Sequence, residues 1–258
     1  THSKTITEPA LLTATSSATA VLCNGDATGA IDITAGGGIL NYTYSWVASN
    51  GGSIGSNSPT SEDLNGLIAG DYTYIITDAN GCQETDVVTL TEPSTSLSAT
   101  SVLTPVACYA DATGEINISV IGGTPGFAGY TYSWVASNGG NLGANPSTSE
   151  DLVGLPAGDY TCTITDVNGC QATDTAIITE PAFPLSATSV VIDVTCHGDA
   201  TGVIDITVLG STSGYTYSWV ASNGGNLGSN PSTSEDLNGL IAGDYTCTIT
   251  DVNGCQVV

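Results

Sequence analysis

Cysteine offers the most chemistry in this chain of 258 residues, which contains eight of them. One set follows a strand-like run in each repeat and comprises Cys23, Cys108 and Cys196. A second set precedes such a run and comprises Cys82, Cys170 and Cys255, and the remaining two are Cys162 and Cys247. Zinc is not supported, because there is no Cys-x-x-Cys spacing and no His-rich tract. Disulfide bonds among the first six cysteines are the expected chemistry.

A repeated Asp-x-Asn-Gly motif is the second candidate, for cation binding. Its oxygen-bearing residues are Asp78, Asn80, Asp166, Asn168, Asp251 and Asn253. Such oxygens suit Ca²⁺, but the motif matches only half of a calcium loop and lacks the closing Glu. Further acceptors are Asp26, Asp111, Asp199 and the Glu-Asp pairs at 62–63, 150–151 and 235–236. We expect turns and solvated carboxylates first, with Ca²⁺ as the one possible cofactor.

Catalysis finds little support in the sequence. The only histidines are His2 and His197, and the Cys196-His197 pair is not repeated elsewhere. A nucleophile, a base and an oxyanion site cannot be assembled from these residues. We therefore assign no catalytic residue and expect a protein that is not an enzyme.

The charge of the chain excludes several kinds of partner. Lys4 is the only Lys or Arg, against 25 Asp and Glu, for a net charge of −24. Nucleic-acid binding rests on cations that neutralise phosphates, so we exclude nucleic acid. Anionic membrane surfaces are disfavoured for the same reason. No apolar run is long enough for a transmembrane helix, so we expect no membrane insertion.

An internal repeat sets the architecture. The block YTYSWVASNGG occurs three times without change, and its tryptophans recur after 88 and 85 residues, at Trp46, Trp134 and Trp219. Units of that length can each bury a core. We predict a terminal strand at 1–9 and three modules at 10–93, 94–181 and 182–258, the third without most of its last strand.

The periodicity of each unit is that of β-strands. Apolar and polar residues alternate in AIDIT (30–34), EINISV (115–120) and VIDITV (203–208). Each unit reads as about seven short strands, with a hairpin at Asn-Gly. This pattern predicts an all-β fold of three tandem Ig-like, PKD-like sandwich modules in an end-to-end array. The expected core aromatics are Trp46, Trp134, Trp219, Tyr72, Tyr160 and Tyr245.

The order of short motifs carries a family resemblance. Cys-x-Gly-Asp-Ala-Thr-Gly, Tyr-Thr-Tyr-Ser-Trp, Ala-Gly-Asp-Tyr-Thr, Thr-Asp-x-Asn-Gly-Cys and Thr-Glu-Pro follow one another along the chain. This series resembles the SprB-type repeat, within the broader PKD and Ig-like modules of bacterial surface proteins. Module 2 departs from it at Tyr109-Ala110, where a turn glycine is missing. The resemblance implies very long, secreted cell-surface adhesins or filaments of gliding bacteria, and no catalytic residue.

Two disulfide arrangements are open. Pairing within modules is simplest, because module 1 holds only Cys23 and Cys82. The first and last strands of an Ig-like sandwich run parallel, however, which puts those two cysteines at opposite poles, roughly 33 Å apart for about ten residues. Stacked modules would instead allow Cys23–Cys170 and Cys108–Cys255, with Cys196 reaching Cys82 of the following chain or repeat. We expect Cys162 and Cys247 to be buried free thiols, with pairing to Cys108 and Cys196 as the minority alternative.

The two ends of the chain match one another. THSKTITEP (1–9) aligns with the ends of two final strands, TDVVTLTEP (85–93) and TDTAIITEP (173–181). We expect either a window cut from a longer array or separate chains joined by β-strand addition. The expected junction residues are Thr5, Ile6, Thr7, Val257 and Val258. Either arrangement predicts a filament with the chain as its repeating unit.

The sequence thus favours a non-enzymatic structural or adhesive extracellular filament whose main partner is itself. A multivalent carbohydrate-binding stalk is the alternative, because near-identical modules gain avidity from weak contacts. Tyr42, Tyr44 and Trp46 share one strand face and could form a stacking platform for glycans, although shared parity more often means core packing. The polar, glycine-rich loop that begins at Ser222 is the better place for such contacts.

Overall fold

The structure is a computed structural model that describes residues 2–258, and Thr1, the first residue of the predicted terminal strand, lies outside them. Throughout this range the regular elements are strands, which confirms the all-β prediction. Six strands form two three-stranded antiparallel sheets in module 1. They are β1 (Thr13–Thr19), β2 (Gly29–Gly36), β3 (Thr43–Ser49), β4 (Leu64–Leu67), β5 (Gly70–Thr77) and β6 (Gln83–Leu90).

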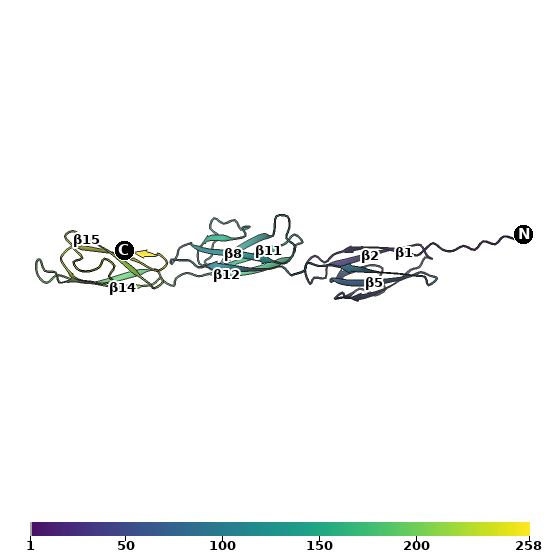
Figure 1. Ribbon diagram of the computed structural model, residues 1–258, viewed down its shortest axis with the longest axis horizontal. Helices are drawn as coiled ribbons and strands as arrows, with labels where there is room; N and C mark the ends of the chain where they lie inside the picture. Colours follow the sequence, from purple (N-terminus) through teal and green to yellow (C-terminus); the bar gives the residue numbers. More distant parts are fainter. Residues whose placement is uncertain (1) are drawn as a thin grey trace. The chain divides into compact units, whose positions relative to one another are not determined.

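The later modules repeat this element order. Module 2 contains β7 (Ser98–Thr104), β8 (Gly114–Ile121), β9 (Thr131–Ser137), β10 (Leu152–Leu155), β11 (Gly158–Thr165) and β12 (Gln171–Ile178). Module 3 contains β13 (Ser186–Ile192), β14 (Gly202–Leu209), β15 (Thr216–Ser222), β16 (Leu237–Leu240), β17 (Asp244–Thr250) and β18 (Gln256–Val257). In each module the first, second and fourth strands form one sheet, and the third, fifth and sixth form the other. Figure 1 shows β1 and β2 in one layer of module 1 and β5 in the other.

The sequence predicted about seven strands in each module, and the structure has six. The long loop after β3 holds no strand, because turns within it already use its backbone groups. Gly52 N donates to Ser49 O, Asn57 N to Ile54 O and Ser61 N to Ser58 O. Local turns satisfy the amides that would otherwise pair with a neighbouring strand.

The described residues form two compact units, and module 2 contributes to both. One contains residues up to Ala99 together with Ser119–Thr131 and Ile164–Thr173. The other contains Thr100–Ile118, Tyr132–Thr163 and Asp174–Val258. Each disulfide described below lies within a single unit.

Alternate residues of the strands point inward and fill the core of each sandwich. On β2, Ile31 and Ile33 face inward, whereas Asp32 between them is exposed. The tryptophan of the third strand is buried in every module and donates its indole N–H to a loop carbonyl, as Trp46 does to Ser61 O at 2.9 Å. A buried indole needs such a partner, so this bond ties the long loop to the core.

A tyrosine at the start of the fifth strand fixes the preceding corner. Tyr160 is fully buried, and its hydroxyl donates to Pro156 O at 2.8 Å. Tyr72 makes the same bond to Ile68 O at 2.7 Å. This is the tyrosine corner of Ig-like folds. Tyr245 also bonds Ile241 O, at 2.9 Å, but it is only partly buried, because β18 covers so little of β17.

The turn after each first strand requires a left-handed backbone at one residue. Gly25 has φ of 81° and Gly198 has φ of 85° at this position. Module 2 places Ala110 there, with φ of 62°. A side chain with a Cβ is strained in this region, so the missing glycine noted in the sequence has a local energetic cost.

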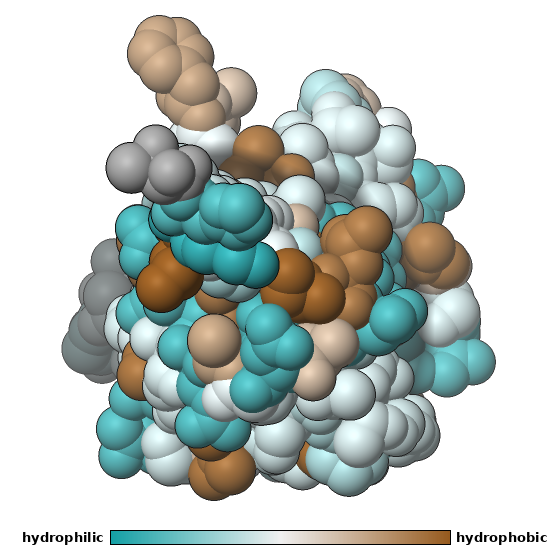
Figure 2. Space-filling model, turned by 90° about the vertical axis from the view of Figure 1, so that its right-hand side faces the viewer, coloured by the Kyte–Doolittle hydropathy of each residue, from teal (hydrophilic) through white to brown (hydrophobic). Residues whose placement is uncertain are grey.

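Hydrophobic side chains are interspersed with hydrophilic ones on the face that Figure 2 presents. Within residues 2–258 we find no helix that is long and apolar enough to cross a membrane.

Candidate functional site: the disulfide junctions

The end of the first strand lies beside the end of the last strand in each complete module. Val21 N donates to Thr91 O at 3.0 Å, and Asn24 Nδ2 donates to Pro93 O at 2.8 Å. The two strands therefore run parallel, and Cys23 lies near the end of β6 whereas Cys82 lies at its start. Pairing within a module, one of the two arrangements left open by the sequence, is not formed for this reason.

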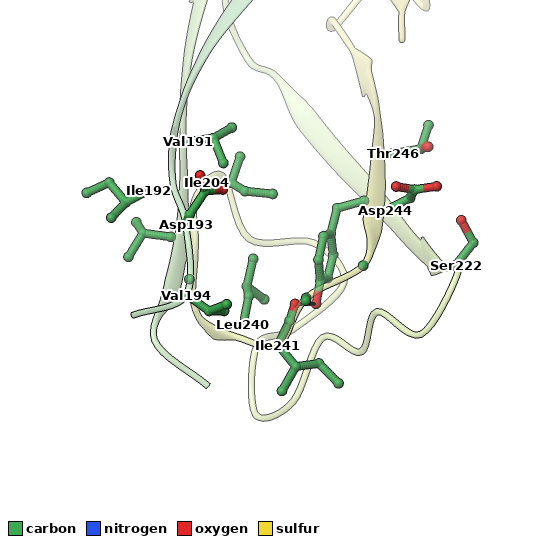
Figure 3. A pocket seen from close by; sticks show the side chains of 15 residues that line it. Val191, Ile192, Asp193, Val194, Ile204, Ser222, Leu240, Ile241, Asp244 and Thr246 are labelled. Carbon is green, nitrogen blue, oxygen red and sulfur yellow. Dashed lines mark hydrogen bonds between the residues drawn. The ribbon is translucent and has the colours of Figure 1, made fainter. Parts of the chain in front are cut away.

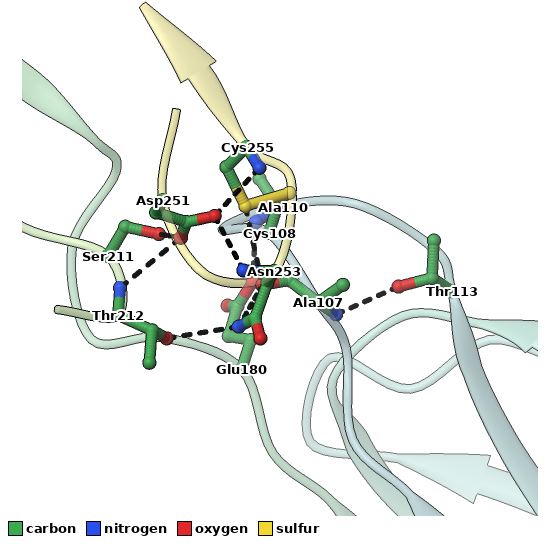
Figure 4. Close-up of a disulfide and its surroundings, with 10 residues drawn as sticks. All are labelled: Ala107, Cys108, Ala110, Thr113, Glu180, Ser211, Thr212, Asp251, Asn253 and Cys255. Carbon is green, nitrogen blue, oxygen red and sulfur yellow. Dashed lines mark hydrogen bonds between the residues drawn. A yellow bond between two sulfur atoms is a disulfide. The ribbon is translucent and has the colours of Figure 1, made fainter. Parts of the chain in front are cut away.

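Both disulfides join consecutive modules instead. Cys23 of module 1 bonds Cys170 of module 2, and Cys108 of module 2 bonds Cys255 of module 3. The Cα atoms are 5.7 Å apart in both pairs, and both pairs span 147 residues of chain. Figure 4 shows the second bond and its surroundings. Two junctions therefore share one geometry.

An asparagine reinforces each junction beside the disulfide. Asn168 Nδ2 donates to Leu22 O at 3.0 Å, and Asn253 Nδ2 donates to Ala107 O at 3.1 Å. The carbonyl that accepts belongs in each case to the residue just before the bonded cysteine. The sequence predicted turns first and calcium binding second for these asparagines, and it missed their role at the junction. No sequence signal singles out this role, because each asparagine and its acceptor are 146 residues apart.

The aspartate that opens the Asp-x-Asn-Gly hairpin holds the junction asparagine and cysteine in place. Asp166 is buried, and its Oδ1 accepts the amides of Asn168 and Cys170, both at 2.9 Å. Its Oδ2 accepts Thr124 N at 2.8 Å, from the loop between β8 and β9. One carboxylate thus shapes the hairpin and docks it to a second loop. Gly169 takes φ of 86°, whereas Asn168 keeps a negative φ.

The same arrangement is preformed in module 1, at the end that faces no earlier module of this chain. Asp78 Oδ1 accepts the amides of Asn80 and Cys82 at 2.9 and 2.8 Å, and its Oδ2 accepts Ile39 N at 2.9 Å. The hydrogen bond from Ile39 is the largest of the effects that together lower the pKa of Asp78. In Asp251 burial acts to raise the pKa, but hydrogen bonds led by that of Ser211 outweigh it and lower the pKa.

Four cysteines are not bonded within the described residues. Cys82 and Cys196 are exposed, and they are the members of the two junction sets that have no partner module here. Cys162 and Cys247 are buried on the fifth strands. Burial raises the pKa of the Cys162 thiol to about 11, and burial also raises that of Cys247. A protonated, enclosed thiol is a packing group and a poor nucleophile.

The Thr-Glu-Pro segment, read from the sequence only as a family motif, also has a structural role. Glu92 Oε2 accepts Gly25 N at 2.6 Å, and Glu180 Oε2 accepts Ala110 N at 2.5 Å. Each glutamate therefore ties the end of its last strand to the turn that carries the junction cysteine. The repetition of Glu two residues after a buried aliphatic residue, Leu90 or Ile178, was the available signal.

The carboxylates considered for calcium are mostly engaged with protein groups. Asp63 Oδ1 accepts Ile33 N at 2.9 Å and Glu62 Oε1 accepts the Tyr44 hydroxyl at 2.7 Å. No group of three or more His, Cys, Asp or Glu residues arranged to hold a metal occurs between residues 2 and 258. Calcium binding stays a prediction.

The aromatic face considered for glycans belongs to the module's own packing. Trp46 is buried, while Tyr42 and Tyr44 are partly buried against the core cluster. The Tyr42 hydroxyl is bonded to Gly37 O at 2.6 Å. Trp46 meets Tyr74 edge-to-face, with ring centroids 5.7 Å apart. All three rings are therefore at least partly covered by the module itself.

The residues expected at an array junction are placed as follows. Thr5, Ile6 and Thr7 form no strand and are exposed, with Ile6 at 98 %. Val257 belongs to the short strand β18, and Val258 is exposed. His197 and Cys196, the sole adjacent Cys-His pair, lie exposed in the turn after β13.

Comparisons with known proteins place these repeats in a family. The model of the SprB repeat matches residues 15–52, 100–141 and 188–226, one stretch in each module. No curated protein matches the chain. Among solved structures, the N-terminal eight Ig domains of Down Syndrome Cell Adhesion Molecule align at 16 % identity and a TM-score of 0.32, covering 91 % of this chain and 33 % of that one. This chain thus spans about a third of that structure's length.

Two further structures align at similarly low identity. Extracellular domains 3–5 of Drosophila OTK show 16 % identity and a TM-score of 0.30, with 85 % of this chain and 86 % of that one covered. Murine CEACAM1b shows 15 % identity and a TM-score of 0.22, with 58 % and 91 % covered. The family match and the two disulfides support an extracellular or surface protein of the adhesin type, because disulfides persist in oxidising compartments. The chain is an array that carries three SprB repeats, one in each of its Ig-like modules.

Proposed function

We propose that this chain is a structural unit of an adhesive filament on the surface of a gliding bacterium. The filament acts without catalysis, by holding many copies of one module in a connected row. The observation that carries the proposal is the repeated junction, in which a disulfide and an asparagine hydrogen bond recur with the same geometry. Such a staple restricts the hinge between two domains, which otherwise move freely.

The charge of the chain suits this role. With a net charge of −24 and a single Lys or Arg, the modules repel one another sideways, which opposes bundling and keeps a long array soluble. Attachment between modules then depends on short-range contacts at the junctions.

Imaging tests the filament on the native cell. Antibodies raised against the full chain should label surface fibres by electron microscopy, and a reductant should make those fibres more curved without dispersing the modules. Label confined to the cytoplasm, or to dispersed single chains in the medium, would overturn the proposal.

Glycan binding is the second candidate, and the long loops favour it. Asn57 Nδ2 donates to Ile54 O and Asn65 O, and its Oδ1 accepts Asn65 N, so the polar loop is held in one shape. Asn230 makes the equivalent bonds in module 3. A preorganised polar surface repeated along an array would gain avidity. Specific binding of the full chain to a glycan array would support this candidate, and the absence of binding on a multivalent surface would remove it.

A further inference from the structure

An open groove runs along module 3 where the other modules carry their last strand. It has a volume of about 610 Å³ and lies between the end of β13, the start of β14 and the start of β17. Figure 3 shows Val191 to Val194 on one side and Asp244 and Thr246 on the other. Ile204 is 9 % exposed here, whereas the equivalent Ile31 of module 1 is 1 % exposed. Strand β18 pairs only with Ile249 and Thr250, so the first half of β17 is an unpaired edge.

Modules 1 and 2 show what fills this place. A Cβ built on Gly29 would lie 2.8 Å from Leu90 Cδ1, and one built on Gly114 would lie 2.7 Å from Ile178 Cγ2. The glycine therefore makes room for one branched side chain of the last strand. At Gly202 of module 3 the three nearest atoms belong to Leu240 and Ile192 instead. The groove is missing one aliphatic side chain at a defined position.

We propose that residues 5–9 of a second copy of this chain complete module 3, so that copies join head to tail by the same junction that joins modules. This proposal deepens the proposed filament by naming the contact between copies. The segment TITEP (5–9) matches TLTEP (89–93) and IITEP (177–181) residue by residue. It is exposed and, as Figure 1 shows, extends away from module 1. Ile6 takes the place of Leu90 and Ile178, against Gly202.

Two hydrogen bonds donated by backbone amides fix the register of the inserted segment. Val21 N donates to Thr91 O in module 1 and Val106 N donates to Thr179 O in module 2. By equivalence, Val194 N of one copy donates to Thr7 O of the next. Glu8, the counterpart of Glu92 and Glu180, then accepts Gly198 N.

The same docking brings the two unbonded junction halves together. Residues 5–9 lead directly into module 1, as residues 89–93 lead into module 2. The preformed hairpin of Asp78 then presents Asn80 to Thr195 O and Cys82 to Cys196. The Sγ atoms of Cys82 and Cys196 bond, each thiol losing a proton. The two electrons reduce a small-molecule disulfide to two thiols.

Two charged residues depart from the repeat pattern at this site. Lys4, the only Lys or Arg in the chain, stands where Val88 and Ala176 stand in the complete modules. The groove of module 3 is lined by Asp193, where modules 1 and 2 have Ala20 and Pro105. The two departures from the repeat pattern are opposite in sign, and because Val88 and Ala176 are buried, a docked Lys4 would replace an apolar core side chain.

The test follows assembly of the purified full chain in oxidised and reduced glutathione. Non-reducing electrophoresis should show a ladder at multiples of one chain, and peptide mapping should find Cys82 bonded to Cys196. Ile6→Asp should lower the yield of the ladder at least tenfold, because it puts a charge against Gly202. Thr5→Asp is the matched control, since the equivalent Thr89 and Ile177 are exposed, and it should leave the yield within twofold. Residues 2–10 form no strand, so both variants should keep the circular dichroism of the parent.

Sedimentation separates docking from oxidation. Cys82→Ser should abolish the covalent ladder but leave reversible association that Ile6→Asp removes. A ladder that is insensitive to Ile6→Asp, or a chain that stays monomeric in both assays, overturns the proposal. A single very large species in native material after full reduction also overturns it, in favour of one continuous polypeptide, and leaves the surface filament itself intact. Surface fibres absent from cells would instead count against the filament alone.

Discussion

Asn168 of module 2 donates its side-chain N–H to the carbonyl of Leu22 in module 1, directly beside the Cys23–Cys170 disulfide. The bond holds the two modules at the point where they are covalently linked. Asn168→Ala should therefore make this disulfide about fivefold easier to reduce, the effect of one net hydrogen bond of about 1 kcal/mol. A titration with dithiothreitol, quenched at each concentration and read by mass spectrometry, gives the midpoint of reduction of this disulfide. Asn80→Ala, the equivalent change in module 1, should leave this midpoint unchanged.

Removal of the hydroxyl of Tyr160 should destabilise module 2. Tyr160→Phe leaves Pro156 O and Asn141 N without the partner that bonds them now, inside a fully buried corner. We expect a loss of about 1–3 kcal/mol in the free energy of unfolding by urea. The matched change Tyr245→Phe should have a smaller effect, since that side chain is partly open to water. Equal effects of the two variants would contradict the role given to burial.

Relief of strain at Ala110 should stabilise module 2. Its φ of 62° lies in the left-handed region, where a Cβ is unfavourable by about 1–2 kcal/mol. Ala110→Gly should therefore raise the free energy of unfolding by about 1 kcal/mol. The neighbouring Ala112 has no such φ, so Ala112→Gly should lower it by about 0.5–1 kcal/mol through added chain entropy. If Ala110→Gly were instead less stable than Ala112→Gly, the left-handed turn at Ala110 would carry no strain.

Acid should weaken the hairpin that carries Asp78. Its pKa is lowered in the folded chain from the usual 3.8, chiefly by the Ile39 hydrogen bond. A lowered folded-state pKa adds stability that is complete above the unfolded pKa and is lost as the pH falls through the folded one. The difference in Tm between the parent and Asp78→Asn should thus be constant from pH 7 to about 5 and shrink below about pH 4. Calorimetry across this range measures it, and a difference that does not vary with pH would contradict the assignment.

Thiol reactivity should divide the four unbonded cysteines into two classes. Iodoacetamide should label the exposed Cys82 and Cys196 of the monomeric chain within minutes. Cys162 should react at least 100-fold more slowly, because it is buried and its pKa is about 11, so little thiolate forms at neutral pH. Peptide mapping after timed labelling measures both rates. Labelling in urea is the control, where all four should react alike.

The sequence determined much of this molecule. Alternation of apolar and polar residues placed the ends of β2 and β8 to within two residues, because one face of a strand must be apolar wherever it meets a core. It also predicted burial of Trp46 and Tyr72, since large aromatics at inward parity pack inside. The three-fold repeat also predicted one such core in each module.

Tertiary structure alone decided how the cysteines pair. The sequence left Cys23 with two candidate partners, because cysteine spacing does not state which poles of a sandwich meet. Only the parallel course of β1 and β6 separates Cys23 from Cys82 and leaves Cys170 within 5.7 Å. The roles of Asn168 and Glu92 were hidden for the same reason: each acts on a residue of another strand or module, at a distance in sequence that no local pattern encodes.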